Sequence, residues 1–476
     1  MTHAASDAPA AGHALRRQLG RRDLVLMQVL LVYGVTWAGL AARQGSAHMV
    51  FWLAGILLLL LPVAGVVQYC SRIWPLEGGV YQWTRHALGP LPGFLAAWNF
   101  GLWALLVVAS LGLITATSLS YALGPPAAWM AESTWFIAVL NLLIFGLILL
   151  VNVRGLGIGR WVGHFGTAVT LLVVALVVVL LVVHPAARQG HPPVGAQRPF
   201  ALAWPALTAL SLNLFAKLTF NGLTGLEQVA VFAGETRDPA RSILSSAWIA
   251  APLVALMYIL TTGALLAYTP AAQIDLNGPI PQLLAAAFTG GAAPAAVWLG
   301  RAAILLLASA TVAQYAVIVA ETARLPLVAA WDRLLPAAFM RLHPRYRTPT
   351  RSLTVIVGLA LAVALLSSAD AGAQEAFQVI VTSANVCYCI NYLFMFAVPL
   401  AAGRRFAATP SALLRAGCVC GAAVTLLAVV FSFVPVVAVA DPRRYALKVA
   451  ALPLLMNAVA VLIYRRAQRA ATAPTP

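Results

Sequence analysis

The chain is poor in charge. Only 9% of its 476 residues are charged, and just 13 of them are acidic, whereas a soluble globular domain averages about 25% charged residues. Hydrophobic residues make up 62% of the chain, and its mean hydropathy is +0.89. This composition excludes an ordinary soluble protein and places most of the chain in a membrane.

Cysteine is also scarce. The five cysteines all lie in or beside apolar segments, at Cys70, Cys387, Cys389, Cys418 and Cys420. The last four form two pairs with a spacing of two residues, and such pairs point to opposite sides of a helix. The cysteines are therefore interpreted as packing residues, and the sequence predicts no metal site and no cofactor.

Motifs for hydrolysis and for nucleotide binding are missing. The sequence has no HExxH, no GxSxG and no Walker motif, so the common metalloproteases, serine hydrolases and ATP-driven pumps are excluded. Transport by such a chain must be facilitated or coupled to a gradient. Two other functions stay open: a non-transporting membrane sensor or structural subunit, and an intramembrane enzyme. The enzyme is disfavoured because no catalytic pair emerges.

Long apolar runs dominate the rest of the chain. We count about twelve, most of them long enough to cross a hydrocarbon core ~30 Å thick as a helix. The sequence therefore predicts an all-α polytopic membrane protein. The expected spans cover residues 24–42, 50–71, 93–122, 135–153, 163–183, 205–231, 244–268, 296–323, 352–368, 375–400, 412–435 and 445–464.

The positive charge is distributed by topology. The formal net charge is +17, which in a soluble protein would suggest nucleic acid as a partner. Here most Lys and Arg residues fall in alternate loops, as the positive-inside rule requires if both termini are cytoplasmic. We expect the basic loops to contact lipid head groups, expect no nucleic-acid partner, and place the chain in the plasma (inner) membrane.

Two expected spans are interrupted by glycine. Gly34 and Gly39 lie in the first span, and Gly222 and Gly225 lie in the sixth. Glycine costs about 1 kcal/mol in a helix interior, so paired glycines at matching places favour unwound segments in two inverted repeats. Ordinary close packing of membrane helices is the alternative.

The sixth span also carries a polar face. Its members recur at intervals of three or four residues, which puts them on one side of a helix: Asn213, Lys217, Asn221, Thr224 and Gln228, with Glu227 close by. Lipid penalises such a face, so it must line a substrate path or lock helices together. Both interpretations stay open, and Lys217 in particular is unresolved. Weaker polar stripes occur in three other spans, with Asn99, Ser110, Gln314, Glu321, Thr382 and Tyr392 among their members.

Three motifs carry a family resemblance. They are "PLEGGVYQW" after the second span, "FNGLTGLEQVAVFAGETRDPARSI" in and after the sixth, and "RLPLVAAWDRLLPAAF" after the eighth. In this order, and on these sides of the membrane, they resemble the amino acid–polyamine–organocation family. The resemblance implies a secondary transporter of amino acids or related amines that works by alternating access.

The resemblance also implies a fold and a site. The fold is the leucine-transporter type, with inverted five-helix repeats at 24–183 and 205–400, two further helices at 412–464, and cytoplasmic tails at 1–23 and 465–476. The substrate would bind at two helix breaks, formed by Tyr33, Gly34, Val35 and Thr36 in the first span and by Asn221, Gly222, Leu223, Thr224 and Gly225 in the sixth. Glu227 would couple or gate transport, with the proton as coupling ion, in symport or in substrate exchange.

The chain departs from the family pattern at three places. Bulky Trp37 follows the first break in "GVTWAG", and Arg333 replaces the usual glycine after Asp332. Some members carry a lysine in the fifth span, but residues 163–183 contain neither Lys nor Arg. Glu227 is therefore the better candidate for coupling. A site lined by Asn221, Thr224 and Trp37 has no evident counter-charge, which favours a substrate with a neutral side chain.

Overall fold

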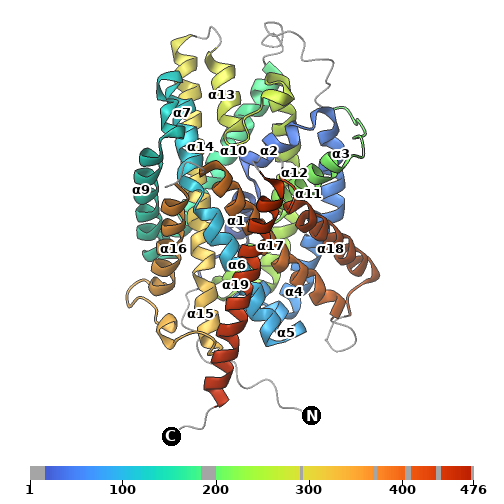
Figure 1. Ribbon diagram of the computed structural model, residues 1–476, viewed down its shortest axis with the longest axis vertical. Coiled ribbons are helices and arrows are strands. Elements are labelled where there is room, and N and C mark those ends of the chain that lie inside the picture. The colour runs from blue at the N-terminus through green and yellow to red at the C-terminus, as the bar shows by residue number, and fades with distance from the viewer. Residues whose placement is uncertain are drawn as a thin grey trace.

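The chain folds into an elongated bundle of helices (Figure 1). The computed structural model describes residues 17–183, 200–289, 293–368, 373–401, 409–435 and 441–472, and no strand occurs among them. The helices are α1 (Arg21–Val32), α2 (Val35–Ala42), α3 (His48–Gly55), α4 (Leu61–Ile73), α5 (Val80–Leu88), α6 (Pro90–Val108), α7 (Leu111–Leu123), α8 (Trp129–Glu132), α9 (Thr134–Val153), α10 (Leu156–Val183), α11 (Ala209–Leu223), α12 (Pro239–Tyr268), α13 (Pro279–Thr289), α14 (Pro294–Thr322), α15 (Arg324–Trp331), α16 (Thr350–Ser368), α17 (Ala373–Ala401), α18 (Ala412–Ser432) and α19 (Pro442–Thr472).

The prediction of an all-α polytopic membrane protein is confirmed. Within the described residues, nine helices are long and apolar enough to cross a membrane, or ten if the bent pair α1 and α2 counts as one span. The expected span at 352–368 corresponds to α16, a shorter apolar helix. The expected span at 205–231 corresponds to α11 with the break and part of the 3-10 helix that follow it. The count of twelve and the division into two repeats stay predictions.

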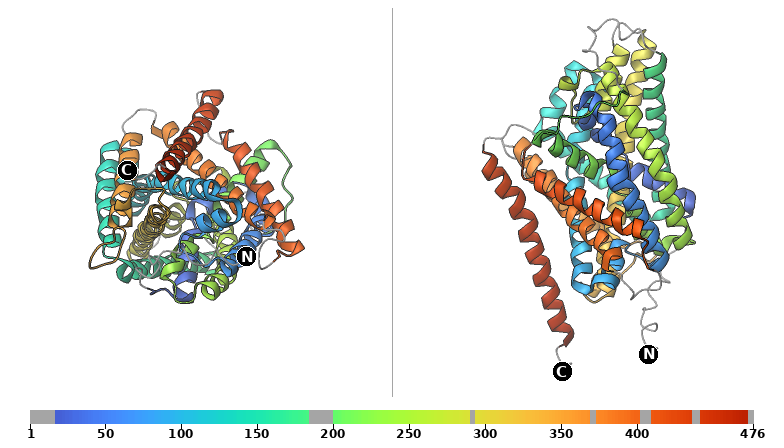
Figure 2. Two further views of the ribbon diagram at one scale, coloured as in Figure 1. Left: turned by 90° about the horizontal axis from the view of Figure 1, so that it is seen from below. Right: turned by 90° about the vertical axis from the view of Figure 1, so that its right-hand side faces the viewer.

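The helices turn apolar faces outward, as a lipid-embedded bundle requires. On α9, Leu143 and Leu147 are exposed, whereas Phe145 and Asn152 are buried. In a bilayer only a helix satisfies all its backbone groups within its own segment. Only 17% of the apolar stretch of α19 is buried. Figure 2 shows this helix leaning away from the main body.

We call the end at which α5, α15 and the last turns of α19 lie the tail side (Figure 1). The opposite end, where α13 lies, is the distal side.

The first expected span is bent by 45° between α1 and α2. Tyr33 and Gly34 have extended backbones, with φ/ψ of −79°/106° and −110°/120°, and Val35 already begins α2. The break is therefore narrower than the expected 33–36, because Val35 and Thr36 belong to the first turn of α2.

The sixth expected span is interrupted too. Helix α11 ends at Leu223, and a 3-10 helix, η6 (Gln228–Glu235), begins after four non-helical residues. Gly225 has φ +117°, a conformation that favours glycine. The chain therefore leaves the helix around the second glycine, so that the break at 224–227 lies later than the expected 221–225. Asn221, Gly222 and Leu223 form the last turn of α11.

The two breaks lie next to each other in the bundle. Helix α11 packs against α2, and α1 packs against η6 and α12. The Gln28 amide on α1 donates a 2.7 Å hydrogen bond to the Leu226 carbonyl in the second break. This arrangement brings together segments separated by almost two hundred residues.

Candidate functional site

The first break is closed by a tyrosine from α12. The Gly34 N–H donates to the Tyr258 hydroxyl at 2.8 Å, and that hydroxyl donates to the Val32 carbonyl at 2.9 Å. Tyr258 is fully buried and stacks on Trp52, with ring centroids 4.5 Å apart. One side chain therefore satisfies a backbone donor and a backbone acceptor that the interruption would leave unpaired.

A glutamine from α14 covers the end of α1. The Gln314 side-chain nitrogen donates to the Leu30 carbonyl at 2.6 Å and lies 3.3 Å and 3.4 Å from the carbonyls of Leu31 and Tyr33. The last carbonyls of a helix have no intrahelical partner and carry partial negative charge. Gln314 supplies the donor that these carbonyls need.

The start of α2 keeps backbone donors available. The Gly34 N–H is engaged by Tyr258, but the N–H groups of Val35 and Thr36 belong to the first helical turn and have no intrahelical acceptor. A helix N-terminus of this kind favours a negatively charged group such as a carboxylate.

Trp37 lies close to Gly34 and to Gly222. A Cβ atom on Gly34 would meet the Trp37 ring at 2.8 Å. A Cβ atom on Gly222 would meet the Trp52 ring at 3.1 Å and the Trp37 Cβ at 3.5 Å. Gly34 and Gly222 therefore make room for two indole rings, one on each side of the site.

Glu227 is the most highly coordinated carboxylate of the second break. It is 1% exposed. The Tyr388 hydroxyl donates to its Oε1 at 2.6 Å, the Tyr392 hydroxyl donates to its Oε2 in a short bond, and the Gly225 N–H lies 3.2 Å from Oε2. The Gln228 amide donates to the Tyr388 hydroxyl at 2.8 Å. Glu227 thus connects the break to α17 through two phenols.

Sequence reasoning identified part of this arrangement. Tyr392 and Gln314 were in the predicted polar stripes, but Tyr388 and Tyr258 were missed. Tyr388 precedes Tyr392 by four residues, so the helical spacing could have revealed it. Tyr258 precedes Thr261 and Thr262 by three and four residues on α12, so helical spacing could have grouped it with them, but not with the first break.

The other residues that the sequence assigned to the second break form hydrogen bonds mainly within α11. The Asn221 amide donates to the Lys217 carbonyl at 2.8 Å, and the Thr224 hydroxyl donates to the Phe220 carbonyl at 2.6 Å. Leu223 is fully buried. The structure thus places all the expected residues of this break near one another.

Lys217 has a structural contact. Its ammonium donates to the Val434 carbonyl at 2.8 Å, just beyond the end of α18. Asn213, one turn earlier, lies 3.4 Å from the same carbonyl. These contacts tie α11 to α18 and point away from Glu227 along the helix.

Two of the weaker polar stripes also hold helices together. Asn99 on α6 and Asn457 on α19 exchange amide hydrogen bonds of 2.6 Å and 3.0 Å. The hydroxyls of Thr382 and Tyr445 lie 2.9 Å apart. The stripes therefore divide into residues that reach the breaks and residues that join helices.

A buried ion cluster closes the tail side. Arg324 donates to Glu235 in a short bond, and its Nε lies 3.8 Å from Glu77 Oε1. Glu77 Oε2 accepts a 2.5 Å hydrogen bond from the Gly234 N–H. Burial and the neighbouring Glu235 raise the pKa of Glu77 well above its ordinary value, against the opposing effects of Arg324 and Gly234. Arg324 therefore interacts with both carboxyl groups, those of Glu235 and Glu77.

A second tail-side contact lies next to the departure at Arg333. Asp332 lies 3.1 Å from Arg85 and accepts a short hydrogen bond from Tyr81. Arg333 has φ +58°, a left-handed conformation that glycine adopts without strain. The position thus has the backbone for which the family's glycine is suited, although an arginine occupies it.

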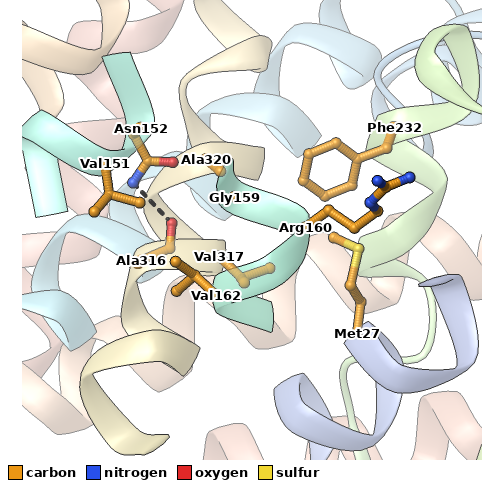
Figure 3. A pocket seen from close by; sticks show the side chains of 10 residues that line it. All are labelled: Met27, Val151, Asn152, Gly159, Arg160, Val162, Phe232, Ala316, Val317 and Ala320. Atoms are coloured by element: carbon orange, nitrogen blue, oxygen red, sulfur yellow. Dashed lines mark hydrogen bonds between the residues drawn. The ribbon is translucent and has the colours of Figure 1, made fainter. Parts of the chain in front are cut away.

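Two cavities border η6. The first, about 330 Å³, is lined mainly by apolar groups together with Arg160 (Figure 3). Its Asn152 amide already donates to the carbonyls of Ile148 and Ala316 at 3.0 Å. The second, about 230 Å³, is lined by Glu227, Gln228, Asn391 and Leu325, among others. The Asn391 amide is fully buried and has no hydrogen-bond partner among the described residues.

The sequence comparisons agree with this geometry. The chain matches the amino acid permease family over residues 19–463. It is 29% identical to an uncharacterised transporter of Mycobacterium bovis, with 75% of each chain covered. It is 24% identical to a methylthioribose transporter of Bacillus subtilis, with 75% of this chain and 76% of the relative covered. It is 22% identical to a branched-chain amino acid permease of the same organism, with 71% and 72% covered.

These matches confirm the resemblance carried by the three sequence motifs. They indicate a transporter rather than an enzyme. The match extends over nearly the whole described bundle, including both helix breaks and the tail-side ion cluster. The chain is an integral membrane protein that belongs to the amino acid permease family.

Proposed function

We propose that the protein is a secondary active transporter of amino acids or related amines that works by alternating access. It would lie in the plasma membrane with both termini in the cytoplasm, so that the tail side faces the cytoplasm. The observation that carries the proposal is the pairing of two interrupted helices, one with free backbone donors and the other beside a buried carboxylate.

The substrate would bind between the two breaks. Its carboxylate would accept hydrogen bonds from the N–H groups of Val35 and Thr36, with support from the N-terminal end of α2. Tyr33 and Gly34 complete this wall. The opposite wall consists of Asn221, Gly222, Leu223, Thr224 and Gly225, and the carbonyls of its non-helical part would accept hydrogen bonds from the substrate ammonium.

The side chain of the substrate would be neutral. Trp37 and Trp52 lie close to Gly34 and Gly222 beside the breaks, and the Lys217 ammonium is engaged by the Val434 carbonyl. Relatives transport chemically different molecules, such as methylthioribose and branched-chain amino acids. Their names therefore support a small-molecule substrate but do not identify it.

An occluded state of this site would be closed by contacts on both of its sides. On the tail side, Arg324 joins Glu235 and lies near Glu77. On the distal side, Arg43 donates to the Ile274 carbonyl at 2.9 Å, and Tyr121 donates to Asp275 at 2.8 Å. Alternating access would open these two sets of contacts in turn.

Glu227 would couple transport to protons. Its carboxyl is buried beside the substrate site, and its hydrogen bonds to Tyr388 and Tyr392 would change when the second break moves. Loss of those donors favours uptake of a proton by the carboxylate. Symport and exchange both follow from such a site, depending on whether the empty protein can reorient.

Counterflow in proteoliposomes tests this function. The purified full-length chain is reconstituted with an unlabelled amino acid or amine inside, and entry of the labelled compound is followed across a broad panel. At least one compound should accumulate transiently in protein-containing vesicles and not in empty ones. No counterflow and no uptake with any member of the panel would contradict the proposal and favour a non-transporting sensor or structural subunit.

A further inference from the structure

Glu321 is a second carboxyl group in the interior of the bundle, on α14. It is fully buried, and neither of its carboxyl oxygens has a hydrogen-bond partner among the described residues. Glu227 has two phenol donors and one backbone donor. The two glutamates therefore lie in the same part of the protein in opposite environments.

Two charged groups act on Glu321 from its surroundings. They are Glu227, from the second break, and Arg324, three residues further along at the start of α15. Arg324 is already shared, since it donates to Glu235 and to the Ala320 carbonyl and lies 3.8 Å from Glu77. No ion pair links Arg324 to Glu321 within the described residues.

A cavity lies beside Glu227 and the start of α15. Glu227 and Leu325 both line the 230 Å³ cavity, together with the unpartnered Asn391 amide. Leu325, near the start of α15, lies four residues after Glu321, which is near the end of α14. Polar groups without partners beside a cavity are where ordered water is found.

These observations indicate different charge states for the carboxyl groups of Glu227 and Glu321. An ionised carboxylate buried without donors costs several kcal/mol, whereas a protonated carboxyl group is neutral. Two carboxylates within electrostatic range in a protein interior also disfavour double ionisation. Glu227 has the donors that stabilise a negative charge, and Glu321 has none.

We propose that Glu321 is a second proton-binding site, which holds a proton while the tail side is closed and exchanges it during the transport cycle. The inference rests on the proposed role of Glu227 in proton coupling and adds a second site to it. The position on α14 and the absence of any donor make Glu321 distinct from the carboxylate in the break.

The tail-side cluster supplies a way to release this proton. When the tail side opens, Arg324 separates from Glu77 and Glu235, and its guanidinium can then pair with Glu321. The Glu321 O–H bond breaks, the proton passes to water, and the carboxylate is left facing Arg324. When the cluster forms again, Glu321 takes up one proton, so charge and protons balance over a cycle.

Infrared difference spectroscopy tests the proposal directly. The full-length protein is studied in lipid vesicles, and the carbonyl band of protonated carboxyl groups is recorded at neutral pH. E321Q should lose one component of that band. E132Q should keep the whole band, because Glu132 is exposed on α8. An E321Q band identical to that of the wild type would overturn the proposal.

Stability and proton flux provide a second readout. Glutamine mimics a protonated carboxyl group, so E321Q should fold with the thermal stability of the wild type, and so should E321M. A large loss of stability in both variants would show that the ionised form is needed and would overturn the proposal. Proton flux per transported substrate should fall in E321Q and not in E132Q.

The two proposals fail in different ways. Absence of counterflow in the wild-type protein contradicts the transport function and does not alter the infrared band of Glu321. A wild-type protein that exchanges substrate while E321Q keeps the full band contradicts only the inference on Glu321.

Discussion

The hydroxyl of Tyr258 lies 2.8 Å from the Gly34 backbone nitrogen and donates in turn to the Val32 carbonyl. The interrupted first helix is thus held by a side chain from another span rather than by its own backbone. A helix break in a membrane is stable only if neighbouring groups satisfy the backbone that it frees. The geometry of the candidate substrate site therefore depends on α12.

Replacing Tyr258 by phenylalanine should weaken both stability and transport. Y258F leaves a buried donor and a buried acceptor unpaired, which costs about 1–3 kcal/mol. The control is Y268F on the same helix, which removes one hydrogen bond of 2.7 Å to the Leu180 carbonyl, away from the breaks. Thermal stability should fall in both variants, whereas the KM for substrate should rise clearly only in Y258F. An equal effect of the two substitutions on KM would contradict this role.

The conformation of Gly225 should make it the most sensitive glycine of the second break. G225A forces a side chain into the left-handed backbone conformation at φ +117°, and strain of this kind costs of order 1–3 kcal/mol. G146A is the matched control, since a Cβ on Gly146 meets nothing within 4 Å in the middle of α9. The control should gain up to about 1 kcal/mol from better helix propensity. Thermal unfolding of G225A at or above the wild-type temperature would show that the break does not need glycine there.

Much of the bundle could be predicted from the sequence, because the apolar runs fix where helices cross lipid. The glycines at 34, 222 and 225 also indicated both interruptions. Their limits could not be predicted, since the end of α11 depends on the left-handed backbone of Gly225 and the end of α1 depends on Tyr258. The contacts of Tyr258 join residues more than two hundred positions apart, and a local pattern does not record them.

For the polar residues, too, one part of the arrangement could be predicted from the sequence and another part could not. The stripe on α11 identified Lys217 as anomalous, but its partner is a backbone carbonyl at Val434, which no side-chain pattern reveals. Glu227 was expected just beyond a break at 221–225, whereas the structure places it as the last residue of the break at 224–227. The environment of Glu321 was not foreseeable, because its distinguishing feature is the absence of donors around it.

Lys217 should prove to be structural. K217M removes the hydrogen bond to the Val434 carbonyl, which is exposed enough for water to replace the donor. The burial cost of the ammonium is removed as well, so stability should change by about 1 kcal/mol or less. K217R retains a donor and serves as the control. Substrate competition profiles should be the same in K217M, K217R and the wild type. An altered profile in K217M alone would place Lys217 in the substrate path.

The tail-side cluster should make stability depend on pH. The pKa of Glu77 is raised in the folded protein by burial and by Glu235, so folding favours its protonated form. Below the ordinary pKa of glutamate, Glu77 is protonated in both states. As the pH rises from there toward the raised value, the folded state loses stability, by up to about 1.4 kcal/mol per pH unit. E77Q does not titrate and should lose less stability over this window.

Thermal unfolding of the two proteins from acidic to mildly alkaline pH measures this difference. E132Q, which changes an exposed glutamate on α8, controls for the loss of one carboxyl group. The expectation would be contradicted by parallel pH profiles for E77Q and the wild type.

The central claim is that Glu227, held by Tyr388 and Tyr392 beside the second break, couples substrate movement to protons. The most direct measurement compares E227Q with the wild type in proteoliposomes, by net uptake under an imposed pH gradient and by counterflow without one. Glutamine keeps the size of the side chain but cannot exchange a proton, so E227Q should lose the pH dependence of net uptake to a much greater extent than it loses counterflow. Net uptake in E227Q that responds to the pH gradient as in the wild type would contradict the account.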